Sequence, residues 1–192
     1  MLIAITGGIG SGKSVVSRIL ASMGYEVYDT DSRAKMLMDQ SDVVKERLVR
    51  HFGENVVVDG EINRPLLSRI VFGDTEKLRQ LNTIVHHLVI NDINCNFARN
   101  ECERPKFVET AILYQSGLDK YVDAVWEVTA SETVRVARVM RRNGLTAEQV
   151  RARIASQQHT PRYPHPEVHQ LVNDNRHPLL PQILKLISQI AD

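Results

Sequence analysis

A glycine-rich segment at residues 7–14, with the sequence GGIGSGKS, holds the residues whose types and spacing most clearly indicate chemistry. It fits the pattern G-x-x-x-x-G-K-[ST], in which glycines let the backbone curl so that successive N–H groups point at phosphate oxygens. The ammonium of Lys13 can reach the outer phosphates, and the hydroxyl of Ser14 suits a magnesium ion that bridges them. The segment predicts a loop that binds the phosphates of a nucleotide together with Mg²⁺.

The positions expected to bind the nucleotide lie within this loop or directly after it: Gly8, Gly10, Ser11, Gly12, Lys13, Ser14 and Val15. A glycine-rich turn that happens to precede a helix is the structural alternative, but it would not require lysine and serine at these two positions. The dinucleotide-binding pattern G-x-G-x-x-G is not met, because Lys13 stands where its third glycine belongs. A guanine-reading Asn-Lys-x-Asp motif is also missing from the sequence. Nicotinamide enzymes and GTPases are therefore disfavoured.

Two carboxylates follow a short apolar run at residues 25–28, namely Asp29 and Asp31. If that run is a parallel strand, both carboxylates lie at the carboxyl edge of the sheet, where open α/β proteins bind their ligands. A carboxylate there can orient an acceptor hydroxyl and accept its proton during phosphoryl transfer, which makes Asp31 the candidate base. The alternative is that Asp31 only caps the next helix, with Asp29 as a solvated turn residue.

Glu109 ends another apolar run, residues 107–108, and has two interpretations. Its carboxylate could hold a magnesium-bound water, or it could form a buried ion pair.

An arginine-rich stretch spans residues 131–165, which hold seven arginines against two glutamates. Spacings of three and four bring arginines to one side of a helix, with Arg138 and Arg142 as the leading pair. A lid that carries arginines would neutralise the transferring phosphoryl group and exclude water, so both residues are candidate catalytic residues. The alternative is a set of ordinary surface arginines.

The elements that must position these residues follow a βαβ pattern. Apolar runs predict parallel strands at residues 2–6, 25–28, 106–110, 124–129 and 168–172. Helical patterns follow at residues 15–23, 31–39, 42–52, 65–72, 74–99 and 178–190. The helical stretch between the second and third strands is far longer than a plain crossover needs, which indicates an inserted subdomain. The sequence thus predicts an α/β fold in which helices flank a parallel five-stranded sheet.

Composition narrows the class of protein. The chain has 192 residues, 43% of them hydrophobic, and a formal net charge of +1. These values favour a compact domain with one or two insertions, and they disfavour a disordered chain or a binder of nucleic acid or membranes. Cys95 and Cys102 lack the spacing of a zinc site, so we expect reduced thiols. The first apolar run is too short for a signal or a membrane span, which predicts a cytoplasmic protein.

Taken together, the loop, the two aspartates and several later residues resemble the dephospho-coenzyme A kinase family over nearly the whole chain. Residues 6–14 match the family's TGGIGSGKS, and the DTD of residues 29–31 resembles its DAD. Further matches follow in the family's order: Phe52 with Gly53, residues 59–64, Val71 with Phe72, His86, Arg138 with Arg142, Gln157 and Asn173. Val15 stands where the family commonly has threonine, and His87 where it usually has proline.

The resemblance implies ATP as co-substrate, Mg²⁺, and phosphorylation of the ribose 3′-hydroxyl of dephospho-coenzyme A, the last step of coenzyme A synthesis. It implies that Asn173 lies near the adenine and that the acceptor is contacted by Thr6, Asp31, Arg64, His86 and Leu113. Without it, His86 would be interpreted as a helix-surface histidine. It also implies a P-loop nucleotide-binding core at residues 1–30, 104–130 and 166–192, an acceptor-binding helical region at residues 31–103 and a lid at residues 131–165.

Further expectations concern partners and rival functions. The partner is expected to be a small molecule, and the protein a monomer. Another P-loop small-molecule kinase, such as a shikimate kinase, is an alternative, although the glycine-rich third-strand loop of that family is missing. A non-catalytic switch that binds ATP is the second alternative.

Overall fold

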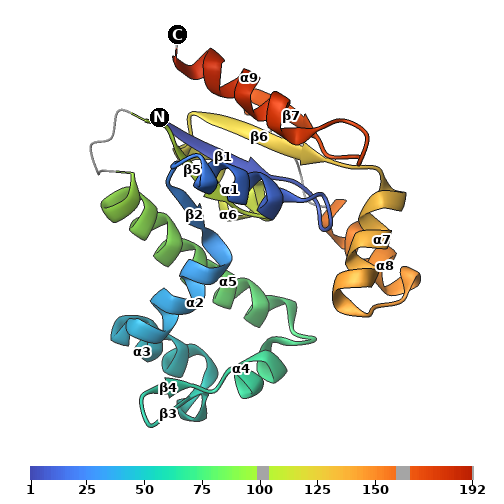
Figure 1. The fold of residues 1–192 in the computed structure, drawn as a ribbon. Coiled ribbons are helices and arrows are strands. Elements are labelled where there is room, and N and C mark those ends of the chain that lie inside the picture. The colour runs from blue at the N-terminus through green and yellow to red at the C-terminus, as the bar shows by residue number, and fades with distance from the viewer. Residues whose placement is uncertain (99–103, 159–164, 192) are drawn as a thin grey trace. The chain divides into compact units, whose positions relative to one another are not determined.

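A computed structural model of the protein describes residues 1–98, 104–158 and 165–191 (Figure 1). Its main sheet has five strands in the order β2-β5-β1-β6-β7, and all neighbouring pairs are parallel. The bounds of these strands are β1 Leu2–Thr6, β2 Val27–Asp29, β5 Lys106–Glu109, β6 Ala124–Thr129 and β7 Val168–Val172. The predicted α/β class and all five predicted strands are confirmed, with small shifts at the ends of the second and third strands.

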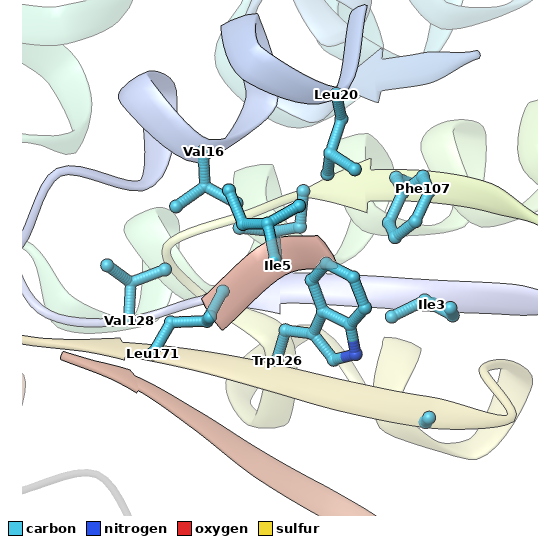
Figure 2. Packing of buried hydrophobic residues seen from close by; sticks show 10 residues of the cluster. Ile3, Ile5, Val16, Leu20, Phe107, Trp126, Val128 and Leu171 are labelled. Carbon is cyan, nitrogen blue, oxygen red and sulfur yellow. The ribbon is translucent and has the colours of Figure 1, made fainter. Parts of the chain in front are cut away.

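The core of the sheet lies under two helices, α1 (Lys13–Ser22) and α9 (Leu179–Ala191). All five residues of β1 are buried, as expected for a central strand that is covered on both faces. Figure 2 shows side chains of α1 directed at the sheet, where they meet the ring of Trp126 and its neighbours. The buried members of this cluster are Ile3, Ile5, Val16, Leu20, Phe107, Ala124, Trp126, Val128, Leu171 and Ile183. Trp126 is therefore a core residue.

The helical insertion has its own elements and its own core. Its helices are α2 (Thr30–Gln40), α3 (Asp42–Phe52), α4 (Arg64–Val71) and α5 (Thr75–Asp92), followed by a π-helix at Ile93–Phe97. A 3₁₀ turn at Glu54–Val56 leads into a small antiparallel hairpin, β3 (Val57–Val58) with β4 (Glu61–Ile62). The buried members of its apolar cluster are Met38, Val44, Leu48, Phe52, Val56, Leu67, Val71 and Ile84.

The chain divides into two compact units. One consists of Met1–Asp29 with Glu101–Asp192 and contains the sheet, and the other is the helical unit Thr30–Asn100. Each unit has its own cluster of buried apolar residues, and burial of this apolar surface stabilises the unit. The roles expected for the helical region and for the lid stay predictions.

Several details of the helices differ from the sequence-based expectation. The long helix expected to end at Arg99 ends at Asp92 and continues as the π-helix, and Arg99 itself lies outside the described residues. The structure also contains a short helix α6 (Leu113–Ser116) and a 3₁₀ turn at Leu118–Tyr121. Both were missed because a segment of four residues is too short to show a helical pattern. The arginine-rich stretch forms α7 (Glu132–Asn143) and α8 (Ala147–Gln158).

Cys95 is a free, exposed thiol, and Cys102 lies outside the described residues. No helix in the described ranges has the length and apolar character that crossing a membrane requires.

Candidate functional site

The predicted phosphate-binding loop lies between β1 and α1, which begins at Lys13. Three of its glycines have backbone conformations that L side chains rarely adopt: Gly7 has φ 147°, Gly10 has φ 77° and Gly12 has φ 99°. Space is also lacking, because a Cβ on Gly10 would lie 2.7 Å from the carbonyl oxygen of Arg135. A Cβ on Gly12 would overlap the side-chain amide of Asn173. The loop is thus built for close packing against segments far along the chain.

The polar side chains of the loop differ in burial and in hydrogen bonding. The Lys13 ammonium donates to the carbonyl oxygen of Gly7 at 2.9 Å, so it is folded over the start of the loop. Ser11 is buried, and its hydroxyl has no hydrogen-bond partner among the residues that the structure describes. Ser14, in the first turn of α1, is exposed. The N-terminus of α1 adds its positive dipole end to the ammonium, which favours a bound anion.

Helices α7 and α8 hold the tip of the loop at Ile9 from both sides. Gln157 on α8 accepts the backbone N–H of Ile9 at 2.7 Å, and Arg135 on α7 donates its Nε to the carbonyl oxygen of Ile9 at 2.8 Å. The Ile9 side chain packs against the apolar cluster of the two helices, which includes Val139 and Ile154. In a planar trans peptide the C=O and N–H groups point in opposite directions, so these bonds fix where the neighbouring loop N–H groups point.

Arg138 holds the next two peptides of the loop. Its Nη1 donates to the carbonyl oxygens of Gly10 at 3.4 Å and Ser11 at 3.2 Å, and its Nη2 donates to Asn173 Oδ1 at 3.2 Å. The side-chain amide of Asn173 donates to the same Ser11 oxygen at 2.8 Å. Arg142 lies one turn further along α7, is exposed, and donates its Nε to Asn143 Oδ1 at 2.9 Å. Of the predicted pair, the structure therefore brings Arg138 to the loop and not Arg142.

Two carboxylates end neighbouring strands beside the loop. In the register of the sheet, Asp29 at the end of β2 is opposite Glu109 at the end of β5, and Glu109 is opposite Ile5 of β1. Glu109 is half-buried, and within the described part of the chain it forms no ion pair. The sequence-based alternative of a buried ion pair at Glu109 therefore finds no support in this part of the chain.

Asp31 follows two residues after the end of β2 and belongs to the helical unit. Helix α2 begins at Thr30, so Asp31 lies inside the first turn of the helix and not before it. A carboxylate in the first turn is stabilised by the helix dipole, which is a weaker and less specific role than that of a capping residue. Its predicted role as the base stays a prediction.

The expected acceptor residues are distributed between the two units. In the helical unit, Arg64 is the first residue of α4 and binds both carboxylate oxygens of Asp39, at 2.9 and 3.0 Å. In the sheet unit, Thr6 ends β1 and Leu113 begins α6, and both are buried. Their expected contacts with the acceptor stay predictions.

His86 lies half-buried on α5, and burial lowers the pKa of its imidazole from 6.5, with a further lowering from the charge of adjacent His87. Its pKa is thus lower in the folded than in the unfolded state, so the unfolded state binds more protons below pH 6.5. The free energy of unfolding should therefore decrease as the pH falls from about 7 toward the lowered pKa of His86. Urea unfolding at several pH values measures this slope.

Replacing His86 with glutamine removes the titrating group, so the pH dependence of unfolding should become flatter over the same interval. An NMR titration of the His86 ring in the parent protein gives the pKa directly. An unchanged slope in His86→Gln, or a ring that titrates above pH 6.5, would contradict the prediction.

Sequence reasoning missed three residues that contact the site in the structure. Arg135 was one of the arginines of the predicted group but not of its leading pair, and Gln157 appeared only as a position shared with the resembled family. Asn175 carried no signal, although its side-chain oxygen accepts from Arg138 Nη2 at 2.6 Å. The spacing of Arg135 and Arg138 on one helix was the only pattern that could have indicated the first of them.

The oxygen donors beside the loop suit Mg²⁺, which prefers hydroxyl, carboxylate and phosphate oxygens. Ser14 supplies an exposed hydroxyl and Glu109 a half-buried carboxylate from the neighbouring strand. Among the described residues, no group of three or more His, Cys, Asp or Glu side chains could hold a metal by itself. This donor set fits an ion that also takes ligands from substrate phosphates and water.

Comparison with known proteins agrees with this geometry. A family model described as dephospho-CoA kinase matches residues 1–179. A dephospho-CoA kinase of Porphyromonas gingivalis is 41% identical over 190 residues, which cover 98% of this chain and 93% of that protein. One from Bacteroides fragilis is 37% identical, covering 97% and 91%. A crystal structure of a Thermus thermophilus protein superposes with a TM-score of 0.76 at 32% identity, covering 100% of this chain and 96% of that one.

Proposed function

Because the chain belongs to the dephospho-CoA kinase family, we propose that it transfers the terminal phosphoryl group of ATP to the ribose 3′-hydroxyl of dephospho-coenzyme A. The protein is an enzyme of coenzyme A biosynthesis of this family's type. The comparisons do not favour the alternatives, a different small-molecule kinase or a non-catalytic switch. The observation that carries the proposal is the glycine-rich loop, closed by Lys13 and held by hydrogen bonds from α7 and α8.

The nucleotide half of the reaction belongs to the loop and to α1. The loop N–H groups and the Lys13 ammonium bind the phosphates of ATP, supported by the helix dipole. The buried hydroxyl of Ser11 supplies a further polar group at the loop. Val15 contributes only its backbone, because its side chain has no polar atom. Asn173 is assigned near the adenine because the resemblance to the family implies it, and in the structure its side chain donates to the Ser11 oxygen of the loop.

Mg²⁺ is part of this proposal, with Ser14 and, through a bound water, Glu109 as the residues that hold it. When bound, the ion neutralises charge that develops on the phosphate oxygens. The residues of the chain orient the phosphates and keep the Lys13 ammonium at the position where the charge accumulates.

The acceptor half is assigned to Asp31 and to the helical unit. Asp31 orients the ribose hydroxyl and accepts its proton. Arg64 and His86 contact the acceptor from α4 and α5, and Thr6 and Leu113 from the sheet unit. The ion pair of Arg64 with Asp39 supports this role, since it holds the guanidinium at the N-terminus of α4.

We assign Arg138 a positioning role, because its guanidinium donates to the carbonyl oxygens of the loop. Neutralisation of the transferring phosphoryl group by Arg142, and a lid at residues 131–165, remain part of the proposal. A monomeric state and a cytoplasmic location also stay predictions.

A coupled assay of ADP release tests the acceptor. Dephospho-coenzyme A should stimulate ADP production far above the rate with ATP alone, and mass spectrometry should show coenzyme A as the product. Shikimate and buffer without acceptor are the controls. Stimulation by shikimate but not by dephospho-coenzyme A would remove the substrate assignment, and ATP binding without turnover of any acceptor would favour the switch.

A further inference from the structure

The segment after β7, residues 173–177, contains an unusual backbone conformation. Asn175 has φ 69°, in the left-handed region, and is one of only two non-glycine residues with positive φ among the described residues. Asparagine tolerates this region better than most residues, but the conformation still needs support from its surroundings.

That support comes from Asp174. Its carboxylate accepts the backbone N–H groups of Arg176 and His177, both at 2.9 Å, and the ring nitrogen Nδ1 of His177 at 2.9 Å. These bonds close a tight turn around Asn175. On the other side, the backbone N–H of Asn173 donates to the carbonyl oxygen of Thr129 at the end of β6. The turn is therefore anchored to the sheet before Asn175 and closed on itself after it.

The turn presents the side chain of Asn175 to Arg138. Oδ1 of Asn175 accepts from Nη2 at 2.6 Å, which is shorter than the bonds of this guanidinium to Gly10, Ser11 and Asn173. A hydrogen bond from a charged donor is about twice as strong as a neutral one. Since Nη1 of the same planar group donates to Gly10 and Ser11, fixing Nη2 also fixes the direction of Nη1.

We propose that Asn175 is a positioning residue for ATP binding: it holds the Arg138 guanidinium on the carbonyl oxygens of Gly10 and Ser11, and so keeps the loop N–H groups directed at the phosphates. The peptide between Ser11 and Gly12 shows the coupling. Its oxygen is fixed by Arg138 and Asn173, so its N–H, on Gly12, must point the opposite way. This inference rests on the proposed function of the loop as the ATP site.

The test uses variants that separate the side-chain oxygen of Asn175 from its backbone conformation. Asn175→Gly keeps the left-handed conformation and removes the oxygen, whereas Asn175→Asp keeps an acceptor oxygen at the same place. Binding of the non-hydrolysable analogue adenylyl imidodiphosphate with Mg²⁺ is measured by calorimetry. Because the bond is charged but exposed to solvent, Asn175→Gly should raise the dissociation constant by about 5-fold. Asn175→Asp should stay within about 2-fold of the parent.

A second experiment uses Arg138→Met, which keeps the aliphatic stem and removes the guanidinium. If Asn175 acts through Arg138, Asn175→Gly should have no further effect in the Arg138→Met background. In turnover, Asn175→Gly should raise KM for ATP and leave kcat within about 2-fold, the pattern of lost binding without lost chemistry. A general structural defect would lower kcat as well and would persist in the double variant.

Parent-like binding by Asn175→Gly, or the same loss with and without Arg138, would overturn the inference. The two proposals can also fail separately. If the parent protein binds the analogue but does not phosphorylate dephospho-coenzyme A, the acceptor assignment fails and the binding test of Asn175 still stands. If the parent binds no analogue, the ATP site and this inference fail together.

Discussion

Replacing Lys13 with methionine should lower kcat/KM for ATP by about 1,000-fold, the scale on which loss of one preorganised charged donor acts on a transition state. The substitution keeps most of the aliphatic stem and removes the ammonium. In the structure this ammonium donates to the carbonyl oxygen of Gly7, which keeps it folded over the start of the loop. No other side chain of the loop carries a positive charge.

The control for this variant is Lys185→Met, on the exposed side of α9, which removes the same charge from the same unit. It should retain the parent's turnover. Thermal unfolding of both variants checks that loss of the hydrogen bond between Lys13 and Gly7 has not unfolded the sheet unit. A loss of less than about 10-fold in folded Lys13→Met would contradict the assignment of Lys13 to the transferring phosphate.

The sequence predicted the central strands β1, β5 and β6 well because nearly all of their residues are buried. Short, mainly apolar runs such as residues 2–6 and 124–129 have few alternative interpretations, since a run of that length cannot form a long amphipathic helix. The phosphate loop was predictable for a related reason. Its function is local: glycines, lysine and serine act within one turn of chain.

Contacts between distant segments were not predictable in the same way. The side chain of Gln157 accepts a hydrogen bond from the N–H of Ile9, 148 positions away in the sequence. Neither residue type predicts the other as its partner. The left-handed conformation of Asn175 likewise depends on hydrogen bonds of Asp174 that form only when the turn closes. Such contacts arise from the packing of whole elements, which a local pattern does not contain.

Helical spacing could not predict which arginine of α7 contacts the loop. Spacing alone put Arg138 and Arg142 on one side of the helix, but it did not fix which turn meets the loop. Burial of Val136 and Val139 against α8 sets that position. Four residues further along an α-helix is a rise of about 6 Å, so Arg142 lies beyond the carbonyl oxygens that Arg138 binds.

Asp31→Asn should lower kcat by roughly 100-fold or more while leaving ATP binding nearly unchanged, because general-base catalysis typically contributes on this scale. The substitution is nearly isosteric and keeps a polar side chain in the first turn of α2, while it removes the charge and the ability to accept a proton. ATP binding is assigned to the loop of the sheet unit, whereas Asp31 belongs to the helical unit. The dissociation constant of the ATP analogue and the rate of ADP release therefore report on different roles.

A purely structural role for Asp31 predicts a different result, and the chain contains a matched control. Asp42 also lies in the first turn of an 11-residue helix of the same unit, α3, and there it stabilises the helix through the dipole and a contact with Lys45. If Asp31 acts only through the dipole of α2, Asp31→Asn and Asp42→Asn should each lower the free energy of unfolding by less than about 1 kcal/mol. The two variants should then also have similar kcat values. If Asp31 is the base, the two variants match in stability but differ in kcat. Equal kcat values in the two folded variants would remove the role of base from Asp31.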